Sequence, residues 1–369
     1  MARAGDGPGG AGAAMTVTAG RRAWRWLCRT RAGRSVTLAV LLLVSAMAFG
    51  IFKLRMPGRS HRGPLPLLAA PAAGAPELPV AEQLRRHVVK LATDIGERHV
   101  GRYAELQAAI AYLEGELRAS GYPAVQRQTY QAGGRDVSNL VVEVGGTERA
   151  AEILVFGAHC DSAPGTPGAN DNGSAVAALL ILARRFAGQP QPRTLRFVFF
   201  VNEEPPFFQT EAMGSWVYAK DCRRRQERIV GMWSLETMGY YSDVKGSQHY
   251  PFPFSLFYPD TGNFIGFVAD GRSAALLKRT IGSFRKHAQF PSEGVAAPDV
   301  VPGLGWSDHW AFWQEGYPAV MITDTAPFRY PHYHEATDTP AQLDYERLGR
   351  VVDGLTAVVR DLATDRELT

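Results

Sequence analysis

The sequence predicts an α/β fold with a mixed, largely parallel central sheet and helices on both faces. Two patterns alternate along the chain and indicate this class. Residues 153–157 (ILVFG) form an uninterrupted apolar run of the kind found in a strand buried on both faces. Residues 103–120 instead repeat leucine and isoleucine at spacings of three and four, which is the period of an amphipathic helix.

The remaining elements follow from the same two periods and from glycine or proline breaks. Further strands are expected at residues 125–130, 140–144, 195–201, 229–235 and 319–323. Further helices are expected at 81–95, 173–186, 213–220 and 273–287, then a short one after 307 and a final one at 343–362. The long aromatic and proline-rich stretch 242–270 lies between a strand and a helix, where such an excursion is more often the wall of a site than an idle loop.

Charge is distributed unevenly along the 369 residues. Residues 1–62 contain 11 Lys or Arg and a single acid, Asp6, which gives a net charge of +10 there and 4 − 10 = −6 for the remainder. The basic character is therefore a property of the N-terminal segment and does not indicate binding to nucleic acid. The three cysteines, Cys28, Cys160 and Cys222, do not make a disulfide framework. Cys28 lies apart in the sequence, and Cys160 and Cys222 are expected to be free thiols.

The N-terminal region is expected to comprise a basic segment (1–34), an uncharged apolar stretch (35–52) and a proline-rich linker (53–79), before a folded domain at 80–369. The 18 residues of 35–52 fall within the range of about 17–25 needed to cross a bilayer. More basic residues precede the stretch than follow it, which favours a single-pass protein of the cell membrane with the folded domain outside the cytoplasm. The alternative is a signal peptide cleaved after Ala46-Met47-Ala48, which would yield a secreted protein.

Polar residues follow successive predicted strands, at the edge where open α/β sheets carry their sites. Taken singly, each has an ordinary structural interpretation: Asp171 as a helix cap, the two glutamates at 203–204 as a solvated turn, Glu236 as another cap. Their joint occurrence at strand ends favours a site. Three carboxylates and two histidines form a ligand set suited to zinc. The candidates are His159, Asp161, Asp171, Glu203, Glu204, Glu236 and His334.

The number and kinds of these candidate residues match what a protein needs to hydrolyse an amide with two metal ions. Two divalent ions about 3.5–4 Å apart can share a hydroxide and polarise a carbonyl. Such a pair needs one bridging carboxylate, a histidine and a carboxylate on each ion, and one free carboxylate as base. The chain supplies Asp171 as the bridge and Glu203 as the base. The two ion sites would then be His159 with Glu236 and His334 with Glu204.

Five motifs in order resemble those of the M28 zinc aminopeptidase family over roughly residues 80–362. They are His159-Cys-Asp161, Gly168-Ala-Asn-Asp171-Asn-Gly-Ser, Asn202-Glu-Glu204, Leu235-Glu-Thr-Met-Gly-Tyr240 and Tyr333-His334-Glu-Ala-Thr-Asp338-Thr. The resemblance implies that His159, Asp171, Glu204, Glu236 and His334 bind metal, that Glu203 is the catalytic base and that Asp161 orients His159. It also implies that the Tyr333 hydroxyl steadies the oxyanion.

Many relatives have Asp where this chain has Glu236, and spacing alone does not separate His332 from His334 as a ligand. In the segment Gly305-Trp-Ser-Asp308-His309-Trp, Asp308 and His309 are expected to support the site or cap a helix, not to bind metal.

We therefore predict a zinc-dependent aminopeptidase that binds two zinc ions per chain and hydrolyses the N-terminal peptide bond of peptide substrates. A dizinc-bridged water and the Glu203 base would perform the reaction. The aromatic residues between Tyr250 and Phe267 would suit an apolar first side chain. One alternative is a single-zinc glutaminyl-peptide cyclase, although those relatives tend to have Trp at the position of Tyr333. Another is a receptor-like ectodomain without catalytic activity.

Overall fold

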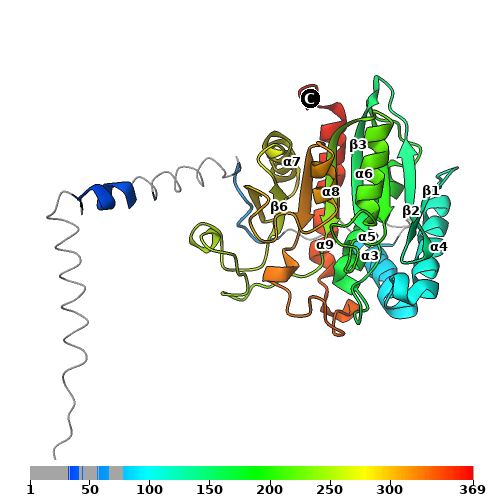
Figure 1. Cartoon of the computed structure of the whole chain (residues 1–369), viewed down its shortest axis with the longest axis horizontal. Coiled ribbons are helices and arrows are strands. Elements are labelled where there is room, and N and C mark those ends of the chain that lie inside the picture. The colour runs from blue at the N-terminus through cyan, green and yellow to red at the C-terminus, as the bar shows by residue number, and fades with distance from the viewer. Residues whose placement is uncertain are drawn as a thin grey trace, which may run out of the picture. The chain divides into compact units, whose positions relative to one another are not determined.

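The computed structural model describes residues 32, 34–40, 44, 56, 58–65 and 78–368. The chain divides into two compact units, residues 1–55 and 56–369. In the first unit the described residues are helical. The second unit contains all the strands and helices discussed below (Figure 1).

The second unit is built on one eight-stranded sheet with the order β1-β2-β4-β3-β5-β8-β6-β7. The four central strands, β4, β3, β5 and β8, are parallel to one another. Strand β2 runs antiparallel to β4 on one side, and β6 runs antiparallel to β8 on the other. The strands are β1 (Gln126–Ala132), β2 (Arg135–Val144), β3 (Arg149–His159), β4 (Arg193–Phe200), β5 (Arg228–Glu236), β6 (Ile265–Ala269), β7 (Ser292–Ala296) and β8 (Ala319–Thr323).

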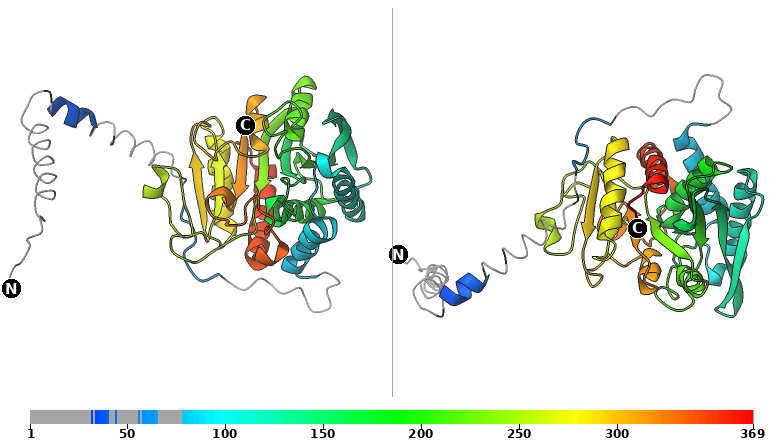
Figure 2. Two further views of the ribbon diagram at one scale, coloured as in Figure 1. Left: turned by 60° about the horizontal axis from the view of Figure 1, so that its bottom comes forward. Right: turned by 90° about the horizontal axis from the view of Figure 1, so that it is seen from above.

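Helices cover both faces of this sheet, as the sequence predicted (Figure 2). On one face α3, α4, α5, α7 and α9 pack against each other and against the strands, and on the other face α6 packs against α8. The helices are α3 (Val80–Val89), α4 (Tyr103–Ala119), α5 (Ala175–Phe186), α6 (Gly214–Arg224), α7 (Ala274–His287), α8 (His309–Gln314) and α9 (Tyr345–Thr364). The predicted fold class is therefore confirmed.

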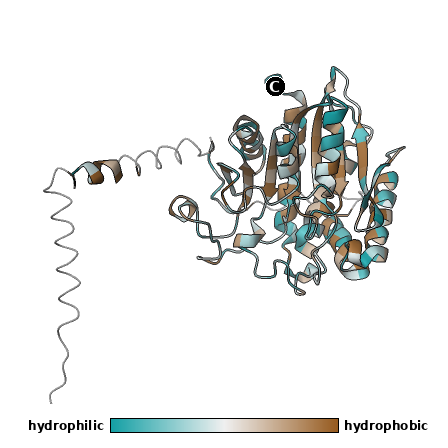
Figure 3. Cartoon of the chain, in the orientation of Figure 1, coloured by the Kyte–Doolittle hydropathy of each residue, from teal (hydrophilic) through white to brown (hydrophobic). Residues whose placement is uncertain are grey.

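The core lies between the sheet and its helical layers. Strand residues colour as hydrophobic in Figure 3, in keeping with a sheet covered on both faces. Helix α5 is buried on almost every side, because it lies between the sheet and the neighbouring helices α3, α4 and α9. Aromatic rings on adjacent strands stack within this core, with Phe156 and Trp233 at a centroid distance of 4.8 Å. This packing holds the carboxyl ends of β3 and β5 in fixed relative positions.

Two strands were not predicted from the sequence. Strand β6 lies inside the aromatic stretch 242–270, and β7 (SEGVA) follows α7. Each has only five residues and contains a glycine, so neither offers the alternation or the long apolar run that identifies a strand locally. They form because β8 presents an edge with which β6 can pair, and β6 then presents one to β7.

The outer edge strand β7 is covered by residues from the predicted linker. Met56 is buried and lies against Gly294, whose position has no room for a Cβ atom because the Met56 side chain occupies it. The backbone N–H of Ser292 donates to Ser60 Oγ at 2.8 Å. Arg285 on α7 donates to the carbonyls of Met56 and Gly58 at 3.4 and 3.2 Å. The described part of segment 56–60 is thus attached to the folded unit.

The expectation of a single-pass membrane protein is wrong. Among the described residues there is no helix both long and apolar enough to cross a bilayer. Within the expected anchor 35–52, the structure describes residues 35–40 and 44, and these are helical. The rest of this stretch, on which the alternative of a cleaved signal also depends, lies outside the described residues.

Candidate metal centre

The predicted site residues come together at one edge of the sheet. His159 and Glu236 are the last residues of β3 and β5, and Glu203 and Glu204 follow shortly after β4. Asp171 lies in the turn Ala169–Ser174 that leads into α5. His334 is in the loop between β8 and α9, with a positive φ of 58°. Because β3, β4 and β5 are parallel neighbours, their carboxyl ends meet here.

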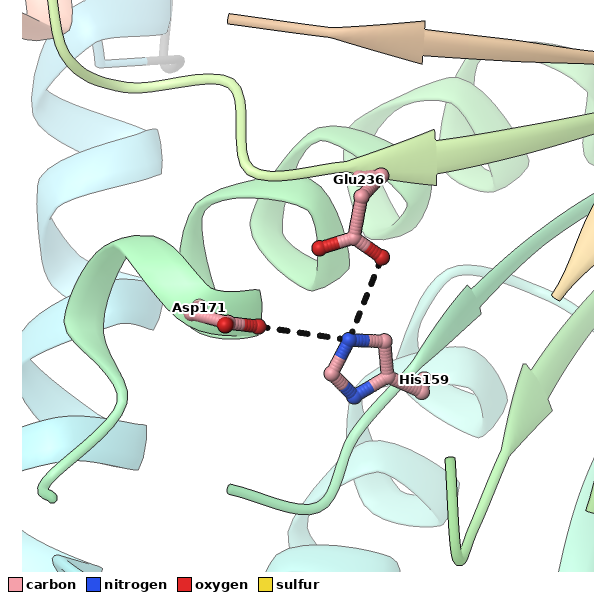
Figure 4. Close-up of side chains that lie close together, drawn as sticks. All are labelled: His159, Asp171 and Glu236. Carbon is pink, nitrogen blue, oxygen red and sulfur yellow. Dashed lines mark ion pairs between the residues drawn. The ribbon is translucent and has the colours of Figure 1, made fainter. Parts of the chain in front are cut away.

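One group of ligand-type atoms surrounds His159. Its Nε2 atom lies 3.3 Å from Asp171 Oδ1 and 3.3 Å from Glu236 Oε2 (Figure 4). Glu203 Oε2 is slightly farther from the same nitrogen, at 3.8 Å. The side chains of His159 and Asp171 are almost completely buried, with 1% and 3% exposed.

A second group surrounds His334. Its Nε2 atom lies 3.1 Å from Asp171 Oδ2 and 3.3 Å from Glu204 Oε2. Asp171 therefore faces both histidines, one with each carboxylate oxygen. His332, which the sequence left as an alternative, instead contacts Thr337 Oγ1 at 2.8 Å through Nδ1. The structure thus brings His334 into the cluster and leaves His332 outside it.

The donors in this cluster fit a bound cation. Several buried polar atoms have no hydrogen bond within the described part of the chain: His159 Nδ1 and Nε2, Asp171 Oδ1 and Glu204 Oε1. Two of them, His159 Nε2 and Asp171 Oδ1, lie 3.3 Å apart. Because buried polar atoms are almost always hydrogen-bonded, such a pair indicates a further partner such as a cation. Three sets of three residues hold one donor atom each within 4.8 Å of one another: His159, Asp171 and Glu236; His159, Glu203 and Glu204; Asp171, Glu204 and His334. Imidazole nitrogens with carboxylate oxygens suit zinc.

The electrostatics of the unliganded side chains lead to the same conclusion. Burial and the neighbouring Glu236 raise the pKa of Glu203 well above its usual range, although His159 opposes this. Burial and Asp171 raise the pKa of Glu204 to about 7. Burial alone would lower the pKa of His159, but Glu236 and Glu203 outweigh it and raise that pKa well above 6.5. Acidic groups held this close repel each other, and divalent cations would remove that repulsion.

Asp161 supports two parts of the centre at once. Its Oδ1 atom lies 3.5 Å from His159 Nδ1, as expected for a carboxylate that orients the imidazole. In addition, its two oxygens accept the backbone N–H groups of Glu203 and Glu204 at 3.3 and 3.1 Å. This second function was not predicted. It means that one carboxylate sets the positions of a histidine and of both glutamates.

Asp338 positions the turn that contains Asp171, again by accepting backbone N–H groups. It accepts the backbone N–H of Asn170 at 2.8 Å and that of Asp171 at 3.1 Å. The Tyr330 hydroxyl donates to it at 2.8 Å. Since Asp338 lies only four residues after His334, it links the loop that carries this histidine to the turn that carries Asp171.

Arg98 is a structural residue of the site that the sequence did not reveal. It is fully buried, and its guanidinium donates to the carbonyls of Cys160, Pro167 and Gly168 at 2.7, 2.6 and 2.8 Å. It thereby joins the segment after His159 to the segment before Asp171. These three carbonyls lie 62 to 70 residues away along the chain, so no local pattern identifies Arg98.

The segment after β7 reaches the centre through Ser307. The Ser307 hydroxyl donates to Glu236 Oε2 at 2.7 Å and also pairs with Ser234 Oγ at 2.7 Å. This hydroxyl therefore holds the Glu236 carboxylate in place. Asp308 is fully buried nearby, and burial raises its pKa to about 7. His309 points elsewhere, with Nε2 2.6 Å from the carbonyl of Leu304.

Tyr333 stacks on His334 with ring centroids 3.9 Å apart and planes 17° apart. Burial raises the pKa of its hydroxyl, so this group stays protonated. Cys160 and Cys222 are buried free thiols, as predicted. The other histidines that the structure describes lie outside the cluster, with contacts such as His87 to Tyr112 and His287 to Asp361.

An apolar cavity of about 100 Å³ opens beside Glu236 and Tyr333. Its walls come from the aromatic stretch that the sequence singled out, including Tyr250, Phe254 and Tyr258. Strands β6 and β7 and the loop that follows β7 complete it. The centre therefore combines clustered carboxylates and histidines with a neighbouring space large enough for a side chain.

A mixed α/β sheet with histidines and carboxylates clustered at the ends of its parallel strands is an arrangement suited to a metal-dependent hydrolase. Residues 139–359 match the model of Peptidase family M28, and the chain belongs to that family. It is 33% identical over 287 residues to the uncharacterized protein YfbL of Escherichia coli K12, covering 75% of this chain and 87% of that protein. It is 25% identical to aminopeptidase YwaD of Bacillus subtilis, covering 56% of this chain but only 40% of the relative.

Solved structures show the same fold at low sequence identity. The LapA aminopeptidase of Legionella pneumophila has a TM-score of 0.61 at 17% identity, covering 78% of this chain and 73% of that one. The glutaminyl cyclase of Tannerella forsythia has a TM-score of 0.56 at 22% identity, covering 76% and 98%. Because both identities are below 25%, these two structures establish the architecture and do not distinguish between the two activities.

Proposed function

We propose that this M28 peptidase is an aminopeptidase that uses a pair of zinc ions. The observation that carries the proposal is the position of Asp171, whose two oxygens face His159 and His334 separately. Each histidine has a further carboxylate at 3.3 Å, Glu236 for His159 and Glu204 for His334. Asp171 would bridge two ions, and each ion would have its own histidine and glutamate. Relatives named as zinc metalloproteases support the choice of metal.

Glu203 is proposed as the general base. It is only 6% exposed and lies beside the cluster without belonging to either Asp171-centred group. Burial raises its pKa, which suits a carboxylate that must take a proton from water and then pass it to the leaving amine. Asp161 would hold Glu203 in place through the backbone N–H that it accepts. When bound, the zinc ions would supply Lewis acidity toward the scissile carbonyl and acidify the attacking water.

Tyr333 and the acidic surroundings would stabilise the oxyanion and recognise the amino group of the substrate. The protonated Tyr333 hydroxyl would donate to the oxyanion of the tetrahedral intermediate. The carboxylates around the centre favour a substrate whose amino group is protonated, as at a peptide N-terminus. The adjoining cavity accommodates one side chain, and this favours removal of single N-terminal residues. Relatives named as aminopeptidases support this choice.

The test is a set of three substrates measured with and without a chelator. We expect release of arylamine from aminoacyl-anilides, loss of release with the chelator, and no release from the N-acetylated analogues. A peptide with N-terminal glutamine separates this activity from that of a glutaminyl cyclase: hydrolysis releases glutamine, whereas cyclisation releases ammonia. Ammonia without arylamine would contradict the proposal, and so would full activity with at most one tightly bound metal ion per chain.

A further inference from the structure

Four consecutive backbone N–H groups directly after Glu236, those of residues 237–240, donate to buried side chains. Their acceptors, in the chain order of the donors, are Asn172 Oδ1 at 2.9 Å, Ser174 Oγ at 2.9 Å, Asn170 Oδ1 at 2.8 Å and Asp324 Oδ2 at 2.8 Å. All four acceptor residues are fully buried. Three of them belong to the segment 169–174, which also carries Asp171. The polypeptide that leaves the end of β5 is therefore held by the turn that carries the proposed bridging carboxylate.

Asn172 forms hydrogen bonds on both sides of Glu236. Its Oδ1 atom accepts the N–H of Thr237, and its Nδ2 atom donates to the carbonyl of Leu235 at 3.0 Å. One amide side chain therefore pairs with both peptide groups that flank the glutamate. Asn172 directly follows Asp171 in the chain, so it ties together the two segments from which Asp171 and Glu236 reach His159 (Figure 4).

Thr237, the residue after the proposed ligand, has a strained backbone. Its φ is positive at 39°, although it is β-branched. Such residues rarely adopt this conformation, and it persists only where the surroundings hold it in place. In addition to the Asn172 bond, the Thr237 carbonyl accepts the Asp324 N–H at 2.7 Å, and the Thr237 hydroxyl contacts Thr323 Oγ1 at 3.1 Å. Without the bonds to Asn172, Thr237 would relax and move the backbone of Glu236.

The side chain of Glu236 is oriented from a different segment. Ser307 donates to Glu236 Oε2 at 2.7 Å, and the same oxygen lies 3.3 Å from His159 Nε2. Ser307 thus directs the carboxylate but has no bond to the backbone on either side of it. Asn172 and Ser307 therefore have separate tasks, because one fixes where the glutamate begins and the other fixes where its oxygen ends.

We propose that Asn172 is a positioning residue of the metal centre, which holds Glu236 opposite Asp171 and so completes the ion site of His159 before a metal ion binds. The inference rests on the metal centre proposed above and not on the peptidase reaction. A carboxylate that is fixed in advance loses less conformational freedom when it binds an ion, so the affinity of this site should depend on Asn172.

The test measures zinc affinity by competition with a chelator, for Asn172→Ala and for a matched control, Asn139→Ala. Asn139 is also fully buried and also bonds to backbone in two directions. Its Oδ1 atom accepts the Val201 N–H at 3.1 Å, and its Nδ2 atom donates to the Gly214 carbonyl at 2.8 Å. Both substitutions are made in the wild type and in His334→Ala, which retains only the buried ion site under test.

We expect Asn172→Ala to weaken zinc binding at the buried site by about 10–100-fold, as for other residues that support a metal ligand, and Asn139→Ala to weaken it by less than about threefold. Unchanged affinity in Asn172→Ala would overturn the inference. An equal loss in Asn139→Ala would also overturn it, because the effect would then be one of general destabilisation.

Hydrogen exchange of the metal-free wild type tests the inference without a substitution that could prevent folding. The amides of residues 237–240 should exchange as slowly as those of β5, because their acceptors are side chains of the protein and not metal ions. Fast exchange that becomes slow only after zinc is added would overturn the inference. A protein that binds zinc as expected but cleaves no anilide would instead overturn only the proposed aminopeptidase function.

Discussion

The candidate metal centre has two halves, one around His159 and one around His334. They contain the same kinds of side chain but have very different surroundings. His159 and Glu236 are at the ends of adjacent strands in the core, and only 1% and 11% of their side chains is exposed. His334 is on a late loop, has a left-handed backbone conformation and is 34% exposed. Asp171 contacts both histidines. A strand end positions its ligand through the whole core, whereas the loop depends on a few hydrogen bonds such as those of Asp338. We therefore expect the halves to differ in metal affinity.

The strongest test of this comparison is to remove the shared residue. Asp171→Ala should lose metal from both halves, because Asp171, alone among the carboxylates that the structure describes, contacts both histidines. We expect less than one metal ion per chain and a loss of activity well beyond the ~10–100-fold typical for residues that only support a ligand. Elemental analysis and anilide turnover measure the two effects. If two ions remain bound, Asp171 is not a bridge.

The next largest effect should come from the adjacent glutamates, which separate catalysis from binding. Glu203→Gln keeps the shape but cannot accept a proton, so turnover should fall by about 10²–10⁴-fold with both ions retained. Glu204→Gln should instead lose one ion, because Glu204 faces His334. The two variants serve as controls for each other. Loss of metal in Glu203→Gln alone would reverse the assignment, and full activity in both would mean that the site lies elsewhere.

A smaller difference should appear when metal is withdrawn gradually. We expect the ion at the exposed half to leave first, with release about 10–100-fold faster than from the buried half, because solvent and chelator reach His334 directly. His334→Ala should accordingly keep about one ion per chain and His159→Ala less. Metal content during a chelator time course gives both rates. Simultaneous release of both ions would show that the two halves act as one unit.

The smallest effect concerns His87, a buried histidine outside the cluster. Burial and the nearby Arg86 and Arg184 lower the pKa of His87 to about 4, in contrast to the raised pKa of His159. Between pH 6.5 and 4 the unfolded chain binds a proton at His87 that the folded chain does not, so acidification favours unfolding. The contribution of neutral His87 to the free energy of unfolding is fully present above pH 6.5. About 2 kcal/mol of this contribution should be lost between pH 6.5 and 5.

The measurement for His87 is a difference between variants, because acid also affects the metal ligands. Denaturant unfolding of the wild type and His87→Gln at pH 7 and pH 5 isolates the contribution of this side chain. The free energy of unfolding of the wild type should fall by about 2 kcal/mol more than that of the variant. Equal decreases would mean that His87 is protonated in the folded protein.

The same contrast explains which features the sequence could predict. Ligand candidates such as His159 and Glu236 are polar residues at the ends of apolar runs, and this local signal identified them. The central strands were equally recognisable because they are buried on both faces. By contrast, Arg98 acts on carbonyls 62 to 70 residues away, and Asp161 accepts backbone N–H groups from another strand end. Contacts of this kind leave no periodic pattern.

Strands β6 and β7 were missed for a related reason. Their residues have little strand character alone, and they pair because β8 and then β6 offer an edge. The apolar cavity depends on that pairing, since residues of β6 and β7 form part of its lining. The sequence therefore indicated an aromatic wall but not the strands that complete the cavity. The expected membrane anchor had a different basis, an uncharged apolar stretch with basic residues on both sides, and among the described residues no helix is long and apolar enough to cross a bilayer.

The attachment of segment 56–60 to β7 has a practical consequence for recombinant production. A protein shortened to begin at Val80, where the first long helix starts, would lack Met56 and Ser60. It would leave Gly294 uncovered and the Ser292 amide without its hydroxyl partner. An uncovered edge strand is a template for pairing with another chain. Such a shortened protein should self-associate at high concentration, whereas one that begins before Met56 should stay monodisperse.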